Sequence, residues 1–205
     1  MVHVDFLQIG AHVGRSPNDH LFSKDMDKKH LILIEPVPYL FETLKENYRA
    51  RAQNNTIEFY NIAISDHDGS LTLYVPSANN DFSRYPFWAS QLASTNADHI
   101  KTHLPDLKVD CINVVCTSLN SLVRFKNITS IDTLYIDTEG HDYDILMAYD
   151  LSLVKPKSIQ FENKHMDGVF QKGPKYQALL AHFAAHGYIV VTEGIEDTLL
   201  QNLRL

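Results

Sequence analysis

Short apolar runs of strand length alternate with helical patterns along this chain, and this alternation limits the folds open to it. Five runs are expected to form buried strands: residues 4–9, 31–34, 57–64, 134–136 and 158–161. After the second run, apolar side chains recur at helical spacing: Leu40, Phe41, Leu44 and Tyr48. Repeated strand–helix units predict a Rossmann-like α/β fold with a mainly parallel sheet and helices on both faces.

The remaining segments complete one domain spanning residues 1–205. Further strands are expected at residues 71–75, 109–116, 188–192 and 198–203, the last two as a hairpin. Further helices are expected to begin at residues 16–19 and to span residues 119–125, 143–149 and 175–186. Residues 76–108 are irregular and too long for a plain connector, which predicts a lid, a binding loop or a partly helical insertion.

Charge and composition argue against several partners. The 205 residues carry a net charge of −7 without a basic stripe, so nucleic acid is not an expected partner. No apolar run approaches the roughly 18 residues of a membrane span, so no membrane association is expected. Asp5 interrupts any apolar run at the N-terminus, which argues against a signal peptide and for a cytoplasmic protein. The oligomeric state is left open.

The cysteines and most of the histidines are not expected to take part in a functional site. Cys111 and Cys116 are expected to be buried free thiols, because positions five apart on a strand face opposite sides. Seven histidines in polar contexts are expected to be solvated: His20, His30, His67, His99, His103, His182 and His186.

A glycine loop after the first strand and an acid after the second indicate a nucleotide-type cofactor. Gly10 allows a tight turn and a close approach of backbone to a ligand, and Gly14 allows the next helix to pack close to the sheet. Glu35 ends the second strand about 20 residues beyond Gly14, where an acid accepts hydrogen bonds from ribose hydroxyls in dinucleotide folds. NAD is the alternative cofactor, but His12 stands where its fingerprint needs a glycine. S-adenosylmethionine has no pyrophosphate and tolerates that side chain.

Several motifs resemble the FkbM family of S-adenosylmethionine-dependent O-methyltransferases. The most specific is Asp-x-Glu-Gly at residues 137–140, and Ala-Ile-Ser-Asp-x-x-Gly at residues 63–69 is another. The matching segments follow in order along the chain: residues 5–14, 31–38, 61–75, 134–146 and 158–162. The resemblance implies the class I methyltransferase fold, a seven-stranded and mostly parallel sheet with an antiparallel last strand. It also implies methyl transfer to a hydroxyl, often of a sugar or glycan.

The resemblance also places the cofactor at the ends of the early strands and of the strand before Asp137. The expected cofactor-binding residues are Gln8, Gly10, Ala11, His12, Gly14, Glu35, Pro36, Ala63, Ile64, Ser65 and Asp137. The family usually has an acid at the position of Gln8, which helps hold the amino end of the cofactor. Gln8 accepts a hydrogen bond from an ammonium but lacks the charge, so weaker cofactor binding is expected.

Four side chains after two neighbouring strand ends are predicted to be catalytic. Asp137 and Glu139 follow one strand, and Glu162 and His165 follow the next. A neutral hydroxyl needs a base or a metal to lose its proton, and these groups share one edge of a parallel sheet. Asp142 is expected instead to cap the helix that begins there.

Two mechanisms remain open. In the favoured one, a carboxylate or His165 removes the proton directly and no metal takes part. In the other, Asp137, Glu162 and Asn163 bind Mg²⁺, which suits oxygen ligands.

The acceptor is expected to be a sugar or glycan, with a deoxyhexose such as rhamnose as the best hypothesis. Residues 76–108 hold Tyr85, Phe87, Trp88 and Gln91, and aromatic rings with polar neighbours suit a sugar. Two alternatives are methylation of another small molecule and a non-catalytic cofactor-binding domain.

Overall fold

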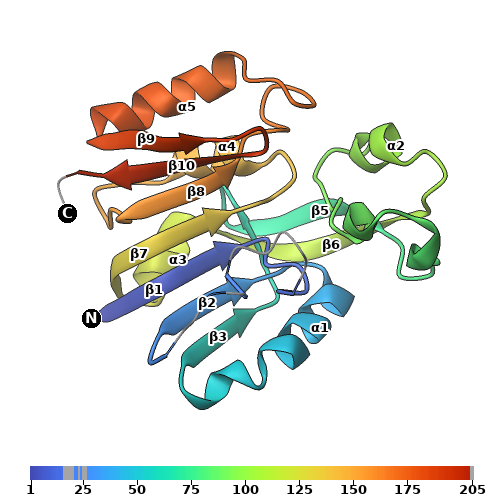
Figure 1. The fold of residues 1–205 in the computed structure, drawn as a ribbon, viewed down its shortest axis with the longest axis horizontal. Coiled ribbons are helices and arrows are strands. Elements are labelled where there is room, and N and C mark those ends of the chain that lie inside the picture. Colours follow the sequence, from blue (N-terminus) through green and yellow to red (C-terminus); the bar gives the residue numbers. More distant parts are fainter. Residues whose placement is uncertain (16–20, 23, 25–26, 204–205) are drawn as a thin grey trace.

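The computed structural model of the chain describes residues 1–15, 21–22, 24 and 27–203 (Figure 1). The helix start expected at residues 16–19 lies outside the described residues.

A seven-stranded sheet forms the centre of the described structure. Its strands follow the order β3 (Thr56–Tyr60), β2 (His30–Ile34), β1 (Val2–Ile9), β7 (Ile128–Ile136), β8 (Ser158–Glu162), β10 (Asp197–Asn202) and β9 (Tyr188–Glu193). The pairs from β3 to β8 are parallel, whereas β10 runs antiparallel to both β8 and β9. The predicted mostly parallel sheet with an antiparallel last strand is confirmed.

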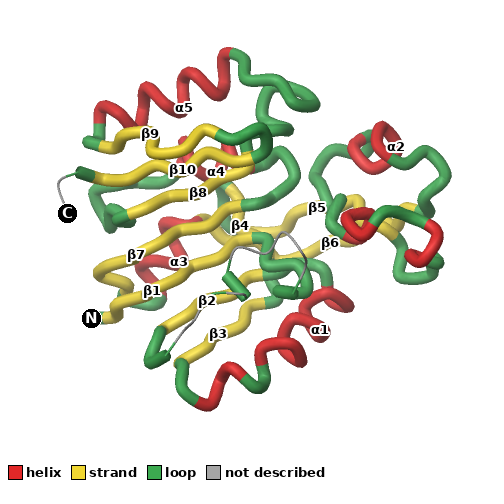
Figure 2. The backbone as a smooth tube through the Cα atoms, viewed as in Figure 1, coloured by secondary structure: helices red, strands yellow, loops and turns green. Residues whose placement is uncertain are grey.

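Helices cover both faces of this sheet (Figure 2), as the alternation predicts. On one face, α1 (Pro38–Tyr48) packs against Leu31 and Leu33 through three residues of the predicted apolar stripe, Phe41, Leu44 and Tyr48, whereas Leu40 packs with residues of the second sheet. On the other face, Ile32 and Ile34 join a larger core with α3 (Leu119–Phe125), α4 (Asp142–Ala148) and α5 (Pro174–Ala185). None of the helices in the described part of the chain is long and apolar enough to cross a membrane.

The single strand expected at residues 57–64 is wrong, because two strands in two sheets replace it. β3 ends at Tyr60, and the Asn61 side chain donates a 2.9 Å hydrogen bond to the carbonyl of Glu35, which holds a bend. β4 (Ala63–Ser65) then joins a second sheet in the order β4, β6 (Val109–Ser118), β5 (Gly69–Pro76). The strands expected at residues 71–75 and 109–116 therefore exist but lie outside the main sheet.

Residues 76–108 form a small lobe that projects from the second sheet (Figure 1). The lobe contains two 3₁₀ turns, η2 (Phe82–Arg84) and η3 (Phe87–Ser90), and one short helix, α2 (His99–His103). It has its own apolar cluster of Leu92, Ile100 and Leu107. Of the forms expected for this segment, the structure shows a partly helical insertion.

The two cysteines lie on opposite faces of β6. Cys116 is buried, but Cys111 is exposed, so the expectation that both are buried is wrong for Cys111. The period of two along a strand explains the difference, because only one face of β6 meets the core.

Candidate active site

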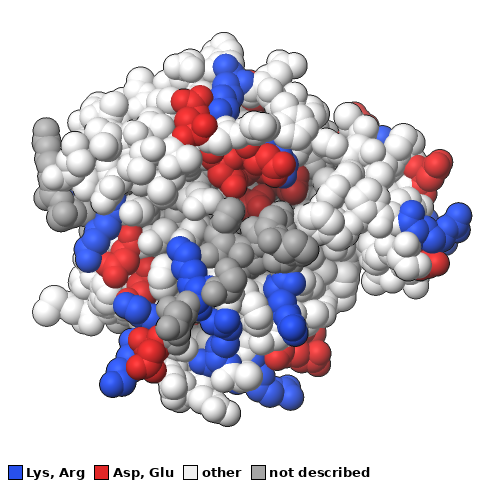
Figure 3. Space-filling model, in the orientation of Figure 1, with Lys and Arg blue, Asp and Glu red and all other residues white. Residues whose placement is uncertain are grey.

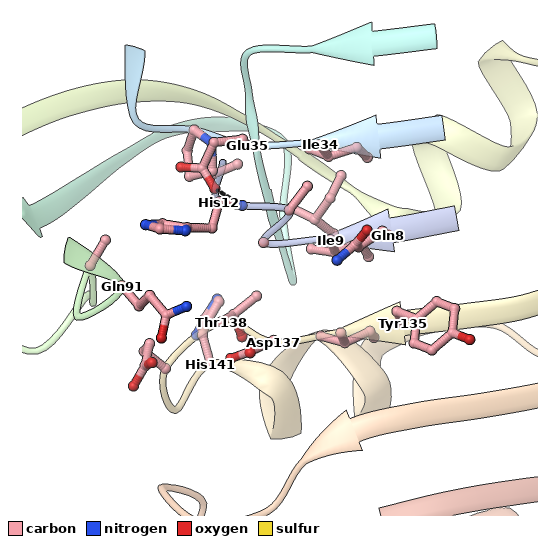
Figure 4. A pocket seen from close by; sticks show the side chains of 18 of the residues that line it. Gln8, Ile9, His12, Ile34, Glu35, Gln91, Tyr135, Asp137, Thr138 and His141 are labelled. Carbon is pink, nitrogen blue, oxygen red and sulfur yellow. Dashed lines mark hydrogen bonds between the residues drawn. The ribbon is translucent and has the colours of Figure 1, made fainter. Parts of the chain in front are cut away.

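A pocket opens at the carboxyl ends of β1, β2 and β7, where β4 approaches them (Figure 4). Most residues predicted to hold the cofactor line it: Gln8, Gly10, Ala11, His12, Glu35, Pro36, Ala63, Ile64 and Asp137. The other two, Gly14 and Ser65, lie outside the lining. Apolar side chains such as Leu40 and Leu71 complete one wall. The pocket therefore joins the early strand ends to the acids after β7.

Gly10 makes this meeting of strand ends possible. Its φ of 77° lies in the left-handed region, and a Cβ placed on it would lie 1.8 Å from the carbonyl oxygen of Asp137. No side chain fits there, so the β1 loop turns directly against the end of β7. Gly14 instead allows close packing against α1, because a Cβ there would lie 2.5 Å from side-chain atoms of Leu44 and Tyr48.

The Glu35 carboxyl is held at the end of β2 by two backbone donors. The N–H groups of His12 and Val37 each donate a 2.8 Å hydrogen bond, one to each carboxyl oxygen (Figure 4). Burial raises the pKa of Glu35 to about 7, although both hydrogen bonds act to lower it. The side chain is thus fixed at the pocket wall with its charge sensitive to pH near neutrality.

Acidic side chains gather in a hollow on the face shown in Figure 3. Asp137 lines the pocket as an exposed residue, and desolvation by its neighbours, followed by repulsion from Glu139, raises its pKa above the ordinary value. Burial, followed by repulsion from Glu139 and Asp137, also raises the pKa of Glu162. Lys164 offsets part of this charge, with its Nζ 2.7 Å from Glu162 Oε1. The predicted acids therefore meet as one coupled group.

Glu139 joins two imidazoles that come from distant segments. His99 Nε2 lies 3.1 Å from Glu139 Oε2, and His165 Nε2 lies 3.2 Å from the same oxygen. Burial alone would raise the pKa of Glu139, but these hydrogen bonds together with the charges of Lys164 and His165 lower it to about 2. The expectation that His99 is solvated is wrong, because only 8% of it is exposed. The signal available in the sequence was the i, i+4 spacing of His99 and His103.

Asp142 is the first residue of α4, and its carboxyl connects the two strand ends. One of its oxygens accepts hydrogen bonds from the N–H and hydroxyl of Thr138, and the other accepts one from the Glu162 N–H at 3.1 Å. Burial raises its pKa to about 6. As expected, an acid stands in the first turn of α4, but the N-cap residue is His141, whose side chain makes no cap hydrogen bond. Nearby, Asn163 directs its amide to Thr198 Oγ1 at 2.9 Å.

The lobe contributes polar side chains to the pocket, but its predicted aromatic residues lie elsewhere. Gln91 and Thr95 line the pocket. Trp88 packs in the lobe's own cluster, and Phe87 is largely exposed. Ser94 Oγ donates a 3.0 Å hydrogen bond to the carbonyl of Glu139, which ties the lobe to the loop after β7.

This sheet order, with a glycine turn after the first strand and a buried acid ending the second, defines a Rossmann-like α/β protein. The family model for the methyltransferase FkbM domain matches residues 8–190, so the chain belongs to the FkbM methyltransferase family.

A solved structure supports the same fold. The methyltransferase FkbM from Methylobacillus flagellatus KT superposes with a TM-score of 0.52 at 13% sequence identity. The match covers 98% of this chain but 44% of the other, so this chain spans less than half the length of that protein. A search of curated proteins finds no significant match.

Proposed function

We propose that this chain is an S-adenosylmethionine-dependent O-methyltransferase that acts on a hydroxyl of a sugar or glycan. The observation that carries the proposal is the pocket itself, where the buried carboxyl of Glu35 and the exposed carboxyl of Asp137 lie on opposite walls. An acid at the end of the second strand suits a ribose, and an accessible acid on the other wall suits a proton acceptor. The family to which the chain belongs is one of methyltransferases.

The residues at the strand ends fit S-adenosylmethionine. Glu35 presents a fixed carboxylate, which suits the two hydroxyls of a ribose. Ala63, Ile64 and Leu71 offer an apolar wall for a flat base. Gln8 offers an oxygen acceptor for an ammonium group. When bound, the cofactor supplies a methyl group that is already electrophilic.

The protein's remaining task is to orient the acceptor oxygen and take its proton. Asp137 is the best placed base, because it lines the pocket and its raised pKa makes its ionised form more basic. Glu139 also lines the pocket, but its bonds to His99 and His165 hold its pKa low. His165 is absent from the lining, and Glu162 is paired with Lys164. We therefore propose that Asp137 is the base that accepts the proton of the acceptor hydroxyl.

Binding of Mg²⁺ by Asp137, Glu162 and Asn163 is less well supported. Lys164 already holds a positive charge against Glu162, with its Nζ 2.7 Å from Glu162 Oε1, and it also lies 4.0 Å from Glu139 Oε1. The direct-base mechanism agrees better with these contacts.

A sugar acceptor agrees with the polar lobe residues Gln91 and Thr95 at the pocket. Side-chain amides and hydroxyls pair well with sugar hydroxyls. We keep a deoxyhexose such as rhamnose as the specific hypothesis, since the resemblance favours sugars.

A labelled methyl donor with a panel of glycans, deoxyhexosides and small phenols tests the proposal. We expect transfer of label to a sugar hydroxyl, resistant to EDTA. Transfer only to non-sugar acceptors would overturn the substrate class. Loss of activity with EDTA that Mg²⁺ restores would overturn the direct-base mechanism. Binding of the donor without any transfer would favour the non-catalytic alternative.

A further inference from the structure

Three imidazoles converge beside Glu139, next to the pocket. His99 and His103 stand one turn apart on α2 and so share one face of that helix. His165 comes from the segment after β8, and its ring centroid lies 4.7 Å from that of His99 and 5.1 Å from that of His103. One potential ligand nitrogen from each of the three histidines lies within 4.8 Å of the others.

The spacing of these atoms suits a metal ion. With metal–ligand distances of about 2.0–2.1 Å, neighbouring ligand atoms in a tetrahedral zinc site lie about 3.3 Å apart. The two imidazole nitrogens lie 3.1 Å and 3.2 Å from Glu139 Oε2, close to that value. Helix-borne histidines at i and i+4 are a recurring way to present two ligands on one side.

Hydrogen bonding within the described residues does not account for the burial of one ring nitrogen of His103. Its Nε2 is buried, and within the described residues no hydrogen-bond partner reaches it. Buried side-chain nitrogens usually have a partner. A metal ion between the three rings would satisfy this nitrogen.

We propose that His99, His103 and His165 bind a transition-metal ion, with Glu139 beside two of them and with Zn²⁺ as the expected ion. Imidazole and carboxylate ligands in a small tetrahedral set suit Zn²⁺, whereas Mg²⁺ prefers oxygen ligands alone. This site adjoins the Mg²⁺ set of Asp137, Glu162 and Asn163, because ligand atoms of Glu162, Glu139 and His165 lie within 4.8 Å of one another, but it differs from that set in its imidazole ligands.

The site has a structural consequence beyond the proposed methyl transfer. His99 and His103 belong to the lobe, and Glu139 and His165 belong to the strand-end loops of the main sheet. A metal ion here would fasten the lobe to the sheet and fix the pocket wall that holds Gln91. Metal binding and donor binding are separable, so either proposal can fail without the other.

The decisive experiment is a zinc titration of chelator-treated protein in competition with a chromogenic chelator. We expect one Zn²⁺ per chain, and Co²⁺ substitution should give the visible absorption of a tetrahedral site. His103→Gln should lower Zn²⁺ affinity at least 10- to 100-fold, the loss seen when even outer partners of metal ligands are changed. His182→Gln is the matched control, because His182 Nε2 is equally buried and unpaired among the described residues. Among the described residues, His182 has one imidazole neighbour, His186.

Two results would overturn the metal site. One is metal-free wild-type protein that binds less than one Zn²⁺ per chain and shows no tetrahedral Co²⁺ spectrum, a result that needs no variant to fold. The other is equal Zn²⁺ affinity in wild type, His103→Gln and His182→Gln, which would place the bound zinc elsewhere.

Discussion

The two walls of the pocket are built in different ways. At the ends of β1 and β2, backbone geometry decides the structure, with Gly10 allowing a tight contact and Glu35 fixed by two N–H groups. At the ends of β7 and β8, side chains from separate segments decide it, as in the His99–Glu139 contact across 40 residues of sequence. The first wall suits a constant cofactor, and the second suits a variable acceptor.

The largest expected effect is on the methyl-transfer rate, when Asp137 in the second wall is replaced. Asp137→Asn should lower the methyl-transfer rate about 10²- to 10⁴-fold, the usual contribution of a general base, with donor affinity changed much less. Steady-state kinetics with labelled donor measures this. Asp150→Asn, whose exposed carboxyl bonds Ser152, is the control and should retain activity. A rate within a few fold of wild type would remove Asp137 from the reaction.

A substitution at Gly10 is expected to disrupt the close backbone contact in the first wall and to lower the stability of the protein. Gly10→Ala should lower the free energy of unfolding by about 3 kcal/mol or more, because its Cβ would meet the Asp137 carbonyl in a strained backbone. Urea denaturation measures it. Gly69→Ala controls for backbone strain, since Gly69 also has positive φ but no atom within 4 Å of the place where the alanine methyl would lie. Equal losses in both variants would show that the close approach is unimportant.

The first wall was largely predictable from the sequence, whereas the second was only partly so. The stripe of α1 and the glycine loop before Glu35 are local patterns, so residue spacing alone located them. The break between β3 and β4 was missed because a tertiary hydrogen bond from Asn61 holds it.

Within the second wall, the acids after β7 and β8 were found because strand ends of a parallel sheet share one edge. The burial of His99 was missed because its partner, Glu139, lies far away in sequence. Trp88 was expected at the acceptor, but the lobe needs it for its own small core.

A pH titration sharpens the role of Glu35. Burial raises its pKa to about 7, and hydrogen bonds from ribose hydroxyls favour the ionised form. Donor affinity should therefore fall as pH drops through 7, by about tenfold between pH 8 and pH 6. Glu35→Gln should bind the donor more weakly and lose this pH step. A step of the same size in the variant would assign it to another group.

The smallest expected effect concerns the lobe. Gln91→Ala should raise the acceptor KM a few fold and leave donor affinity unchanged, because Gln91 lines the pocket from the lobe side. Trp88→Ala should instead lower thermal stability through the lobe cluster. An unchanged acceptor KM in the Gln91 variant would exclude its amide from acceptor binding.

The central claim, that this pocket holds S-adenosylmethionine, is tested most directly by isothermal titration calorimetry of the purified protein. We predict saturable one-to-one binding of S-adenosylmethionine and S-adenosylhomocysteine, no heat with NAD, and weaker binding to Glu35→Gln. Binding of NAD in place of both sulfur compounds, or no binding of any of the three, would contradict the account.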